Sequence, residues 1–294
     1  MKKYLLPLAL LGAALAAEDL VSDVRDAIAK SDFPRAASYI EKYKAKRGET
    51  PESILALSWM ARGSLAQKKY EQAEAYAGQT YDRALGQLKK RPLDREPNLP
   101  LALGASIEVQ AQALAAQDRR TEAVVYLEDQ LKKYARTSMN ARIQKNINLL
   151  TLAGKPAPAL QGMPLPKGKP ALLFFWAHWC PDCRQEAPIL TRLKNEFGPK
   201  GLVVAGPTQK YGYVEGGQEA PPNVEVRYIE QIRQKFYAGL VASPAVVNES
   251  NFLRYGVSTT PTLALVDSGG IVRLYHPGAM TYEELRSAIE PVLR

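Results

Sequence analysis

Apolar residues recur every three or four positions through the first half of the chain. Ile54, Leu57 and Ala61 show this spacing, which is typical of a helix with one face against a core. The alternating pattern of a half-buried strand is nearly absent from the same region. The pattern therefore predicts an all-helical N-terminal domain over residues 18–152.

Three segments of this half share one pattern: a bulky or long residue, an alanine three positions later, then an aromatic or aliphatic pair. They begin at Phe33, Tyr70 and Arg120, each after a short polar turn. The pattern resembles tetratricopeptide-like helix pairs, but the alanines lie further apart than the ~34 residues of a regular array. We expect degenerate repeats, interrupted between Arg91 and Pro100, where prolines cannot continue a helix. Such a domain either binds a partner protein on its concave face or is a plain scaffold.

The pattern changes after residues 154–170, which are rich in proline and glycine and which we interpret as a linker. Short apolar runs of buried-strand type then alternate with helical patterns, which predicts an α/β domain with a mixed sheet over residues 153–294. The predicted strands are Ala171–Trp176, Gly201–Ala205, Ala245–Val247, Leu263–Val266 and Ile271–Tyr275. Helices are expected from Cys180 onward and over Tyr282–Leu293. Residues 207–242 are interpreted as an insertion that ends in a helix and has no assigned role.

The first 17 residues have the layout of a secretory signal peptide. Lys2 and Lys3 precede an apolar run that ends in small residues and is shorter than the ~20 residues of a membrane-spanning helix. We expect cleavage after Ala16 or Ala17, and hence a periplasmic or secreted protein. The alternative is an uncleaved N-terminal anchor.

Composition and charge exclude several classes of protein. The chain has 294 residues, of which 46% are hydrophobic and 23% charged. These values suit two globular domains and exclude a disordered or collagen-like chain. The formal charge of +9 is spread along the chain, and its longest basic tract is Lys89–Arg91. Without a nucleic-acid-binding motif, we expect no nucleic-acid partner.

The only two cysteines, Cys180 and Cys183, mark the candidate chemistry. A zinc site would need two further ligands, and the only histidines are His178 and His276. We therefore expect no metal. A pair of cysteines after a buried strand and at the start of a helix is interpreted as a dithiol/disulfide couple that needs no other cofactor.

The position of each cysteine predicts its role. Free N–H groups and the positive end of the helix dipole should stabilise a thiolate at Cys180, which makes it the attacking nucleophile. Cys183, one turn later, would attack the mixed disulfide that forms. Pro181 suits the first turn because it has no N–H to lose. The Asp182 carboxylate disfavours the thiolate electrostatically, which favours a reducing couple.

Several motifs, in the right order, resemble those of exported TlpA-like disulfide reductases of the thioredoxin fold. They are Gly154–Pro158, Trp176–Pro188 around the cysteines, Tyr255–Thr262, Ser268–Gly270 and Gly278–Ala279. The resemblance covers residues 153–294. It implies a thiol–disulfide oxidoreductase that reduces protein disulfides and receives electrons from a membrane thiol–disulfide relay.

The resemblance also implies roles for single residues around the cysteines. Trp179 would flank the nucleophile and limit its exposure. The Thr260–Pro261 bond would be cis, so that backbone groups of Thr260 can pair with an extended substrate. Trp179, Pro181, Thr260 and Pro261 are thus the expected substrate-binding residues.

Two further positions concern proton and charge balance. Thioredoxins carry a buried aspartate six residues before the first cysteine, and this chain has Phe174 there. A carboxylate elsewhere, for example in residues 207–223, would have to accept the proton of the second cysteine. His178 is expected either on the surface, its more common place, or near Cys180, where a cationic ring would modulate the thiolate.

Two other functions stay open. The same dithiol could act as a thiol oxidase or isomerase, which a reduction potential near the ~−120 mV of strong oxidants would indicate. The chain could also be a binding or assembly protein whose helical repeats do the main work and whose redox domain is secondary.

Overall fold

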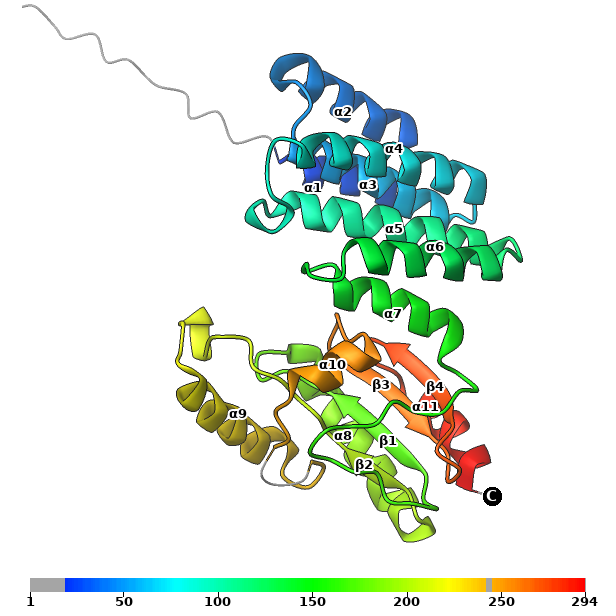
Figure 1. Ribbon diagram of the computed structural model, residues 1–294, viewed down its shortest axis with the longest axis vertical. Coiled ribbons are helices and arrows are strands. Elements are labelled where there is room, and N and C mark those ends of the chain that lie inside the picture. The colour runs from blue at the N-terminus through cyan, green and yellow to red at the C-terminus, as the bar shows by residue number, and fades with distance from the viewer. Residues whose placement is uncertain (1–18, 242–244, 294) are drawn as a thin grey trace, which may run out of the picture.

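The computed structural model describes residues 19–241 and 245–293. The predicted signal peptide and its cleavage site therefore lie outside the described residues. Layers of helices stack on one side of a second, sheet-containing part of the chain (Figure 1). No helix among the described residues combines the length and the apolar character needed to cross a membrane.

The helical part follows the predicted pattern. Its helices are α1 (Leu20–Ala29), α2 (Phe33–Arg47), α3 (Pro51–Ala66), α4 (Tyr70–Leu88), α5 (Asn98–Ala116), α6 (Arg120–Lys133) and α7 (Asn140–Thr151), with a short 3-10 helix, η1 (Leu93–Arg95), before α5. The alanine of each repeated segment is fully buried where the helices pack. These residues are Ala36, Ala73 and Ala123.

Three helix pairs reverse direction at equivalent positions. Ser31, Lys68 and Asp118 have positive φ values of 60°, 59° and 61°, and α2, α4 and α6 each begin two residues later. A left-handed residue turns the chain sharply enough for the second helix of each pair to fold back. The expected polar turns are therefore confirmed.

The interruption between α4 and α5 is shorter than predicted. α5 begins at Asn98, so Pro100 lies inside its first turn instead of outside the helix. Proline is tolerated there because the first N–H groups of a helix have no intrahelical acceptor.

The second part is a four-stranded mixed sheet with the order β2-β1-β3-β4. Its strands are β1 (Ala171–Phe175), β2 (Val203–Ala205), β3 (Thr262–Val266) and β4 (Val272–Pro277). β1 pairs parallel to β2 and antiparallel to β3, and β3 pairs antiparallel to β4. The predicted α/β fold with a mixed sheet is confirmed.

Helices cover both faces of this sheet, which is why every residue of β1 and β3 is buried. The helices are α8 (Pro181–Phe197), α9 (Pro222–Tyr237), α10 (Glu249–Tyr255) and α11 (Tyr282–Ile289), with 3-10 turns η2 (Gly198–Lys200), η3 (Glu215–Gly217) and η4 (Glu290–Leu293). Leu172 and Phe174 pack with α8, α9 and α11, whereas Leu173 and Phe175 pack with α10. Alternation along β1 thus divides the core into two layers.

Two predicted segments differ in the structure. The strand predicted at Ala245–Val247 is wrong: Val247 makes one isolated bridge, to Thr208, because β2 has already ended at Ala205. Residues 154–170 contain no helix or strand, but the start of this segment is hydrogen-bonded to the sheet. Gly154 N–H donates to the Val272 carbonyl (2.8 Å) and Val272 N–H to the Lys155 carbonyl (2.9 Å), so the connection lies along the edge of β4.

Candidate active site

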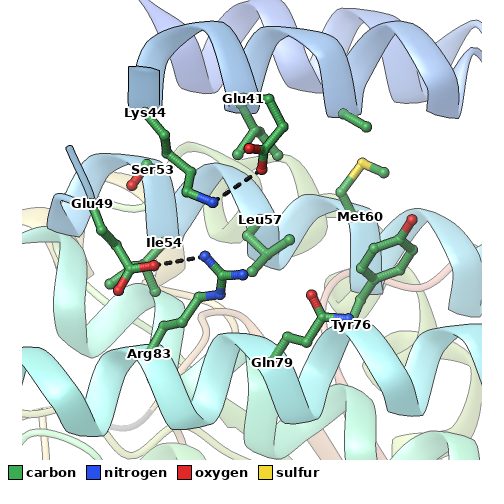
Figure 2. Close-up of a pocket in the computed structure, with 12 residues that line it drawn as sticks. Glu41, Lys44, Glu49, Ser53, Ile54, Leu57, Met60, Tyr76, Gln79 and Arg83 are labelled. Carbon is green, nitrogen blue, oxygen red and sulfur yellow. Dashed lines mark hydrogen bonds and ion pairs between the residues drawn. The ribbon is translucent and has the colours of Figure 1, made fainter. Parts of the chain in front are cut away.

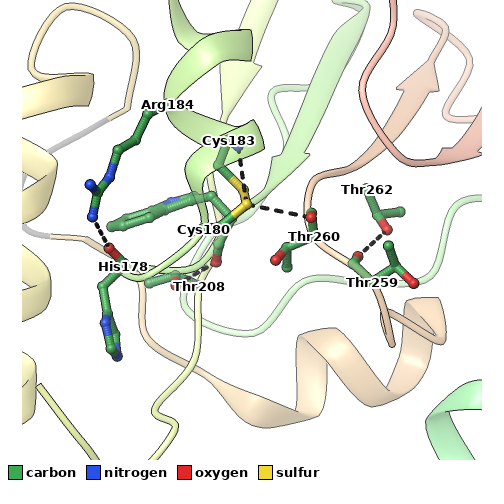
Figure 3. Close-up of a disulfide and its surroundings, with 9 residues drawn as sticks. His178, Cys180, Cys183, Arg184, Thr208, Thr259, Thr260 and Thr262 are labelled. Carbon is green, nitrogen blue, oxygen red and sulfur yellow. Dashed lines mark hydrogen bonds between the residues drawn. A yellow bond between two sulfur atoms is a disulfide. The ribbon is translucent and has the colours of Figure 1, made fainter. Parts of the chain in front are cut away.

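The two cysteines form a disulfide at the start of α8, directly after β1 (Figure 3). Cys180 is the N-cap residue, and Pro181 occupies the first turn, as its missing N–H allows. The Cys183 N–H donates a hydrogen bond to Cys180 Sγ (3.0 Å). Both cysteines are buried, with exposed fractions of 1% for Cys180 and 0% for Cys183. The helix start therefore offers the first sulfur a backbone donor, as a thiolate requires.

A cis peptide bond joins Thr260 to Pro261, as the family resemblance predicts. The Thr260 carbonyl oxygen lies 3.4 Å from Cys180 Sγ, and Figure 3 shows this loop facing the disulfide. The Thr262 hydroxyl donates to the Thr259 carbonyl (2.7 Å) and holds the loop at the start of β3. The backbone of the loop thus lies directly beside the sulfur of Cys180.

Trp179 and Asp182 lie beside the cysteines at the surface. The Trp179 side chain is 43% exposed. Its ring packs edge-to-face against the ring of Tyr211, with 5.5 Å between the ring centres. Asp182 and Pro181 are exposed in the first turn of α8. Exposed side chains therefore form a rim around the buried Cys180.

His178 is buried, so the expectation of a surface position is wrong. Its Nε2 lies 3.2 Å from Glu225 Oε1, and its ring contacts three tyrosines, Tyr211, Tyr213 and Tyr228. Burial lowers the pKa of His178 below its usual value, although the contact with Glu225 opposes the shift. In Figure 3 the ring points away from the disulfide. A cationic His178 beside the thiolate is not the arrangement found.

Glu225, at the start of α9, joins the insertion to the active-site loop. Its carboxylate meets His178 and also accepts hydrogen bonds from the backbone N–H groups of Tyr211 and Gly212. Sequence reasoning missed this residue because nothing in the pattern brings an insertion carboxylate to a residue far earlier in the chain.

Glu186 is a second residue that sequence reasoning missed. It follows Cys183 by one turn of α8, and burial raises the pKa of its carboxyl to about 7, although hydrogen bonds from the Met280 N–H (3.3 Å) oppose the shift. The side chain is only 2% exposed. Phe174, which stands where thioredoxins have an aspartate, packs edge-on against Tyr237 instead. The spacing of three residues from Cys183 was a signal that could have found Glu186.

The rest of the described chain offers no comparable chemistry. A cavity of about 100 Å³ lies between α2, α3 and α4 (Figure 2), but its charged side chains are already paired, Lys44 with Glu41 (3.0 Å) and Arg83 with Glu49 (2.6 Å). Among residues 19–241 and 245–293, no group of three or more His, Cys, Asp or Glu side chains is placed to hold a metal ion.

A buried cysteine pair at a helix start, after a central strand and opposite a cis-proline, defines a thioredoxin-fold thiol–disulfide oxidoreductase. Residues 165–293 match the family model of the thioredoxin-like domain. The chain is 30% identical to the thiol:disulfide interchange protein DsbE of Xylella fastidiosa over 48% of this chain and 70% of that protein. It is 29% identical to the thioredoxin-like protein YneN of Bacillus subtilis over 49% of this chain and 75% of that protein. The chain thus belongs to the thioredoxin-like family of thiol:disulfide interchange proteins.

A thiol:disulfide interchange protein of the thioredoxin family from Chlorobium tepidum aligns with 48% of this chain and 98% of its own, with 19% identity and a TM-score of 0.37.

Proposed function

We propose that this protein is an extracytoplasmic reductase of protein disulfides, in which Cys180 attacks the client and Cys183 releases it. The observation that carries the proposal is the position of Cys180 Sγ, between the Cys183 N–H at the start of α8 and the Thr260 carbonyl of the cis-proline loop. One contact stabilises a thiolate, and the other places the client's backbone beside it.

The exchange takes two steps that together move two electrons to the client. The Cys180 thiolate attacks one client sulfur, so that a bond forms between them while the client disulfide breaks, and the other client sulfur leaves and takes a proton from water. The Cys183 thiolate then attacks Cys180 Sγ. The Cys180–Cys183 bond forms, the mixed disulfide breaks, and the second client sulfur leaves. The Cys180–Cys183 disulfide is the state in which this cycle would end.

Glu186 is the proposed proton acceptor for Cys183. Its position one turn along α8 and its raised pKa of about 7 allow it to take a proton near neutral pH and return it later. Since Phe174 stands where thioredoxins carry the aspartate, Glu186 would take over the role of that aspartate.

The client would bind across the rim of the site. Backbone groups of Thr260, beside Pro261, would pair with an extended client segment, while Trp179 and Pro181 would contact its side chains. Asp182 lies exposed beside them and would disfavour the Cys180 thiolate, which favours reduction over oxidation.

The cellular setting is part of the same proposal. Residues 1–17 would direct export to a periplasmic or secreted location, where a reductase needs an electron donor, for which a membrane thiol–disulfide relay is the proposed source. The helix pairs would form a tetratricopeptide-like domain that binds a protein partner.

Insulin reduction tests this function. The protein, supplied with dithiothreitol, should accelerate insulin reduction, and Cys180→Ser should abolish the acceleration, whereas Asp182→Ala should not. An equilibrium potential measured against glutathione separates the directions: a value near −120 mV would contradict the reductase and favour an oxidase.

A further inference from the structure

The last helix of the helical part, α7, contacts the chain just before the cis-proline loop. The Asn148 side chain, 5% exposed, donates from Nδ2 to the Tyr255 carbonyl at 2.8 Å. The Tyr275 hydroxyl of β4 donates to the same carbonyl at 2.7 Å. One buried acceptor thus joins a donor from the helical part to a donor from the sheet.

Gly256, the next residue, brings the backbones themselves together. It ends α10 in a left-handed conformation with φ of 61°. A side chain at this position would place its Cβ 2.4 Å from the backbone nitrogen of Lys145 and 2.6 Å from the carbonyl carbon of Gln144, both in α7. Only a glycine therefore allows α7 to lie this close to the segment. Figure 1 shows α7 between the other helices and α10.

α7 is itself fixed to the helical part. Glu108 of α5, half-buried, pairs with Arg142 and Lys145 and accepts a hydrogen bond from Asn146 (3.0 Å). The Asn148 amide oxygen is also held, since Gln144 Nε2 donates to it (2.9 Å). Asn148 is therefore a constrained donor, anchored through its own helix to the centre of the helical part.

We infer that the helical domain positions the client-binding loop through α7, with Asn148 as a positioning residue for protein clients. Tyr255 and Gly256 begin the segment that ends at Thr260 and Pro261. The Thr260 carbonyl faces Cys180 Sγ. Fixing the start of this short segment limits where the Thr260 backbone can lie. The inference rests on the proposed function, because it assigns part of client binding to a helix outside the sheet domain.

The effect should distinguish large from small disulfides. A protein client needs the backbone of the cis-proline loop, whereas a small aromatic disulfide needs only the Cys180 thiolate. Loss of Asn148 should therefore weaken binding of a protein client and leave the sulfur chemistry intact.

The experiment compares Asn148→Ala with Gln112→Ala in the full chain. Gln112 Nε2 donates to Asn146 Oδ1 (3.2 Å), so the control also removes a side-chain hydrogen bond of α7, but one that faces α5. Steady-state rates are measured with insulin and with 5,5′-dithiobis(2-nitrobenzoate), and folding is checked by circular dichroism. Asn148→Leu, which fills the volume of the amide without donating, replaces the alanine variant if that variant does not fold.

The expected result is a KM for insulin raised about threefold to tenfold in the Asn148 variant, with the rate on the small disulfide within about twofold of the parent. The Gln112 variant should match the parent on both substrates. An unchanged KM for insulin, or an equal loss on both substrates, would overturn the inference. If the unaltered protein does not reduce insulin at all, the proposed function fails instead.

Discussion

At the scale of single residues, the proposed chemistry depends on two features, a helix start and a buried carboxyl. The Cys183 N–H points at Cys180 Sγ, so the first sulfur gains a donor without help from a charged side chain. Glu186, buried one turn after Cys183, has a pKa of about 7, which suits an exchange of protons near neutral pH.

Glu186→Gln tests the proton acceptor. In the unaltered protein, the rate at which Cys183 resolves a mixed disulfide should rise with pH through about 7, as Glu186 ionises. The glutamine variant should lack this rise and resolve about 100-fold more slowly at pH 8. Stopped-flow measurement of mixed-disulfide decay provides the rate. Glu196→Gln, on the same helix, is the control, and an identical pH profile in the Glu186 variant would place the acceptor elsewhere.

The same residue predicts a pH dependence of stability. Folding raises the pKa of the Glu186 carboxyl from 4.5 to about 7, so the folded protein keeps a proton that the unfolded chain has lost between these values. The free energy of unfolding contributed by this group should therefore fall as pH rises from about 4.5 to 7, by up to about 3 kcal/mol. Urea titrations should show this slope flattened in Glu186→Gln. A slope of the same size in the variant would contradict the assignment.

Features of the site that depend on neighbouring residues were predictable from the sequence, whereas contacts between distant residues were not. The cysteine pair and its helix start were predictable because each is encoded within a few neighbouring residues, and the cis-proline was predictable because its motif resembles that of a known family. The buried place of His178 was not, because its partner Glu225 lies on α9, and only the folded insertion brings the two together.

At the scale of elements, the insertion is docked on the active-site loop by one carboxylate. Glu225 holds the His178 ring and the N–H groups of Tyr211 and Gly212, and Tyr211 in turn contacts Trp179 at the rim of the site. The start of α9 therefore fixes the exposed aromatic ring beside Cys180.

Glu225→Ala should release this contact. The variant leaves a buried imidazole and two backbone donors without their acceptor, which should lower the free energy of unfolding by about 1–3 kcal/mol. Amide hydrogen exchange should rise at Tyr211 and Gly212. Glu219→Ala, an exposed change in the same insertion, should alter neither value. Unchanged protection at both amides in Glu225→Ala would show that the insertion is held in another way.

The sequence predicted most elements, and its errors have local causes. Buried strands such as β1 and β3 show as unbroken apolar runs because both faces are covered. Ala245–Val247 has the same composition but lies past the end of β2, so composition alone could not show that it lacks a partner strand. The first turn of α5 was missed because it tolerates Pro100.

At the scale of the whole molecule, the two parts meet at α7, α10 and β4. The sequence predicted a helical part and an α/β part, but it did not indicate the interface between them. Asn148 and Gly256 look ordinary in a sequence, and their importance depends on a contact between distant segments.

Gly256→Ala tests the interface between α7 and the sheet-containing part, with Gly216→Ala as a matched control. Both glycines have positive φ, 61° and 69°, so each alanine should cost about 1–2 kcal/mol for a left-handed backbone. Space around Gly216 is open, whereas a Cβ at Gly256 would meet α7. The Gly256 variant should therefore lose more stability in urea denaturation and show faster amide exchange in α7. Equal losses of stability in the two variants would contradict a close contact between Gly256 and α7.

The most direct test of the central claim is to stop the exchange halfway. Cys183→Ala leaves Cys180 without the sulfur that releases a client, so the reduced variant, mixed with a disulfide-bonded protein such as insulin, should accumulate a mixed disulfide at Cys180 that mass spectrometry of its peptides identifies. The account predicts this adduct in Cys183→Ala and none in the variant that also carries Cys180→Ser. If Cys180 reacts with iodoacetamide yet forms no adduct with the protein disulfide, the dithiol does not act on protein clients.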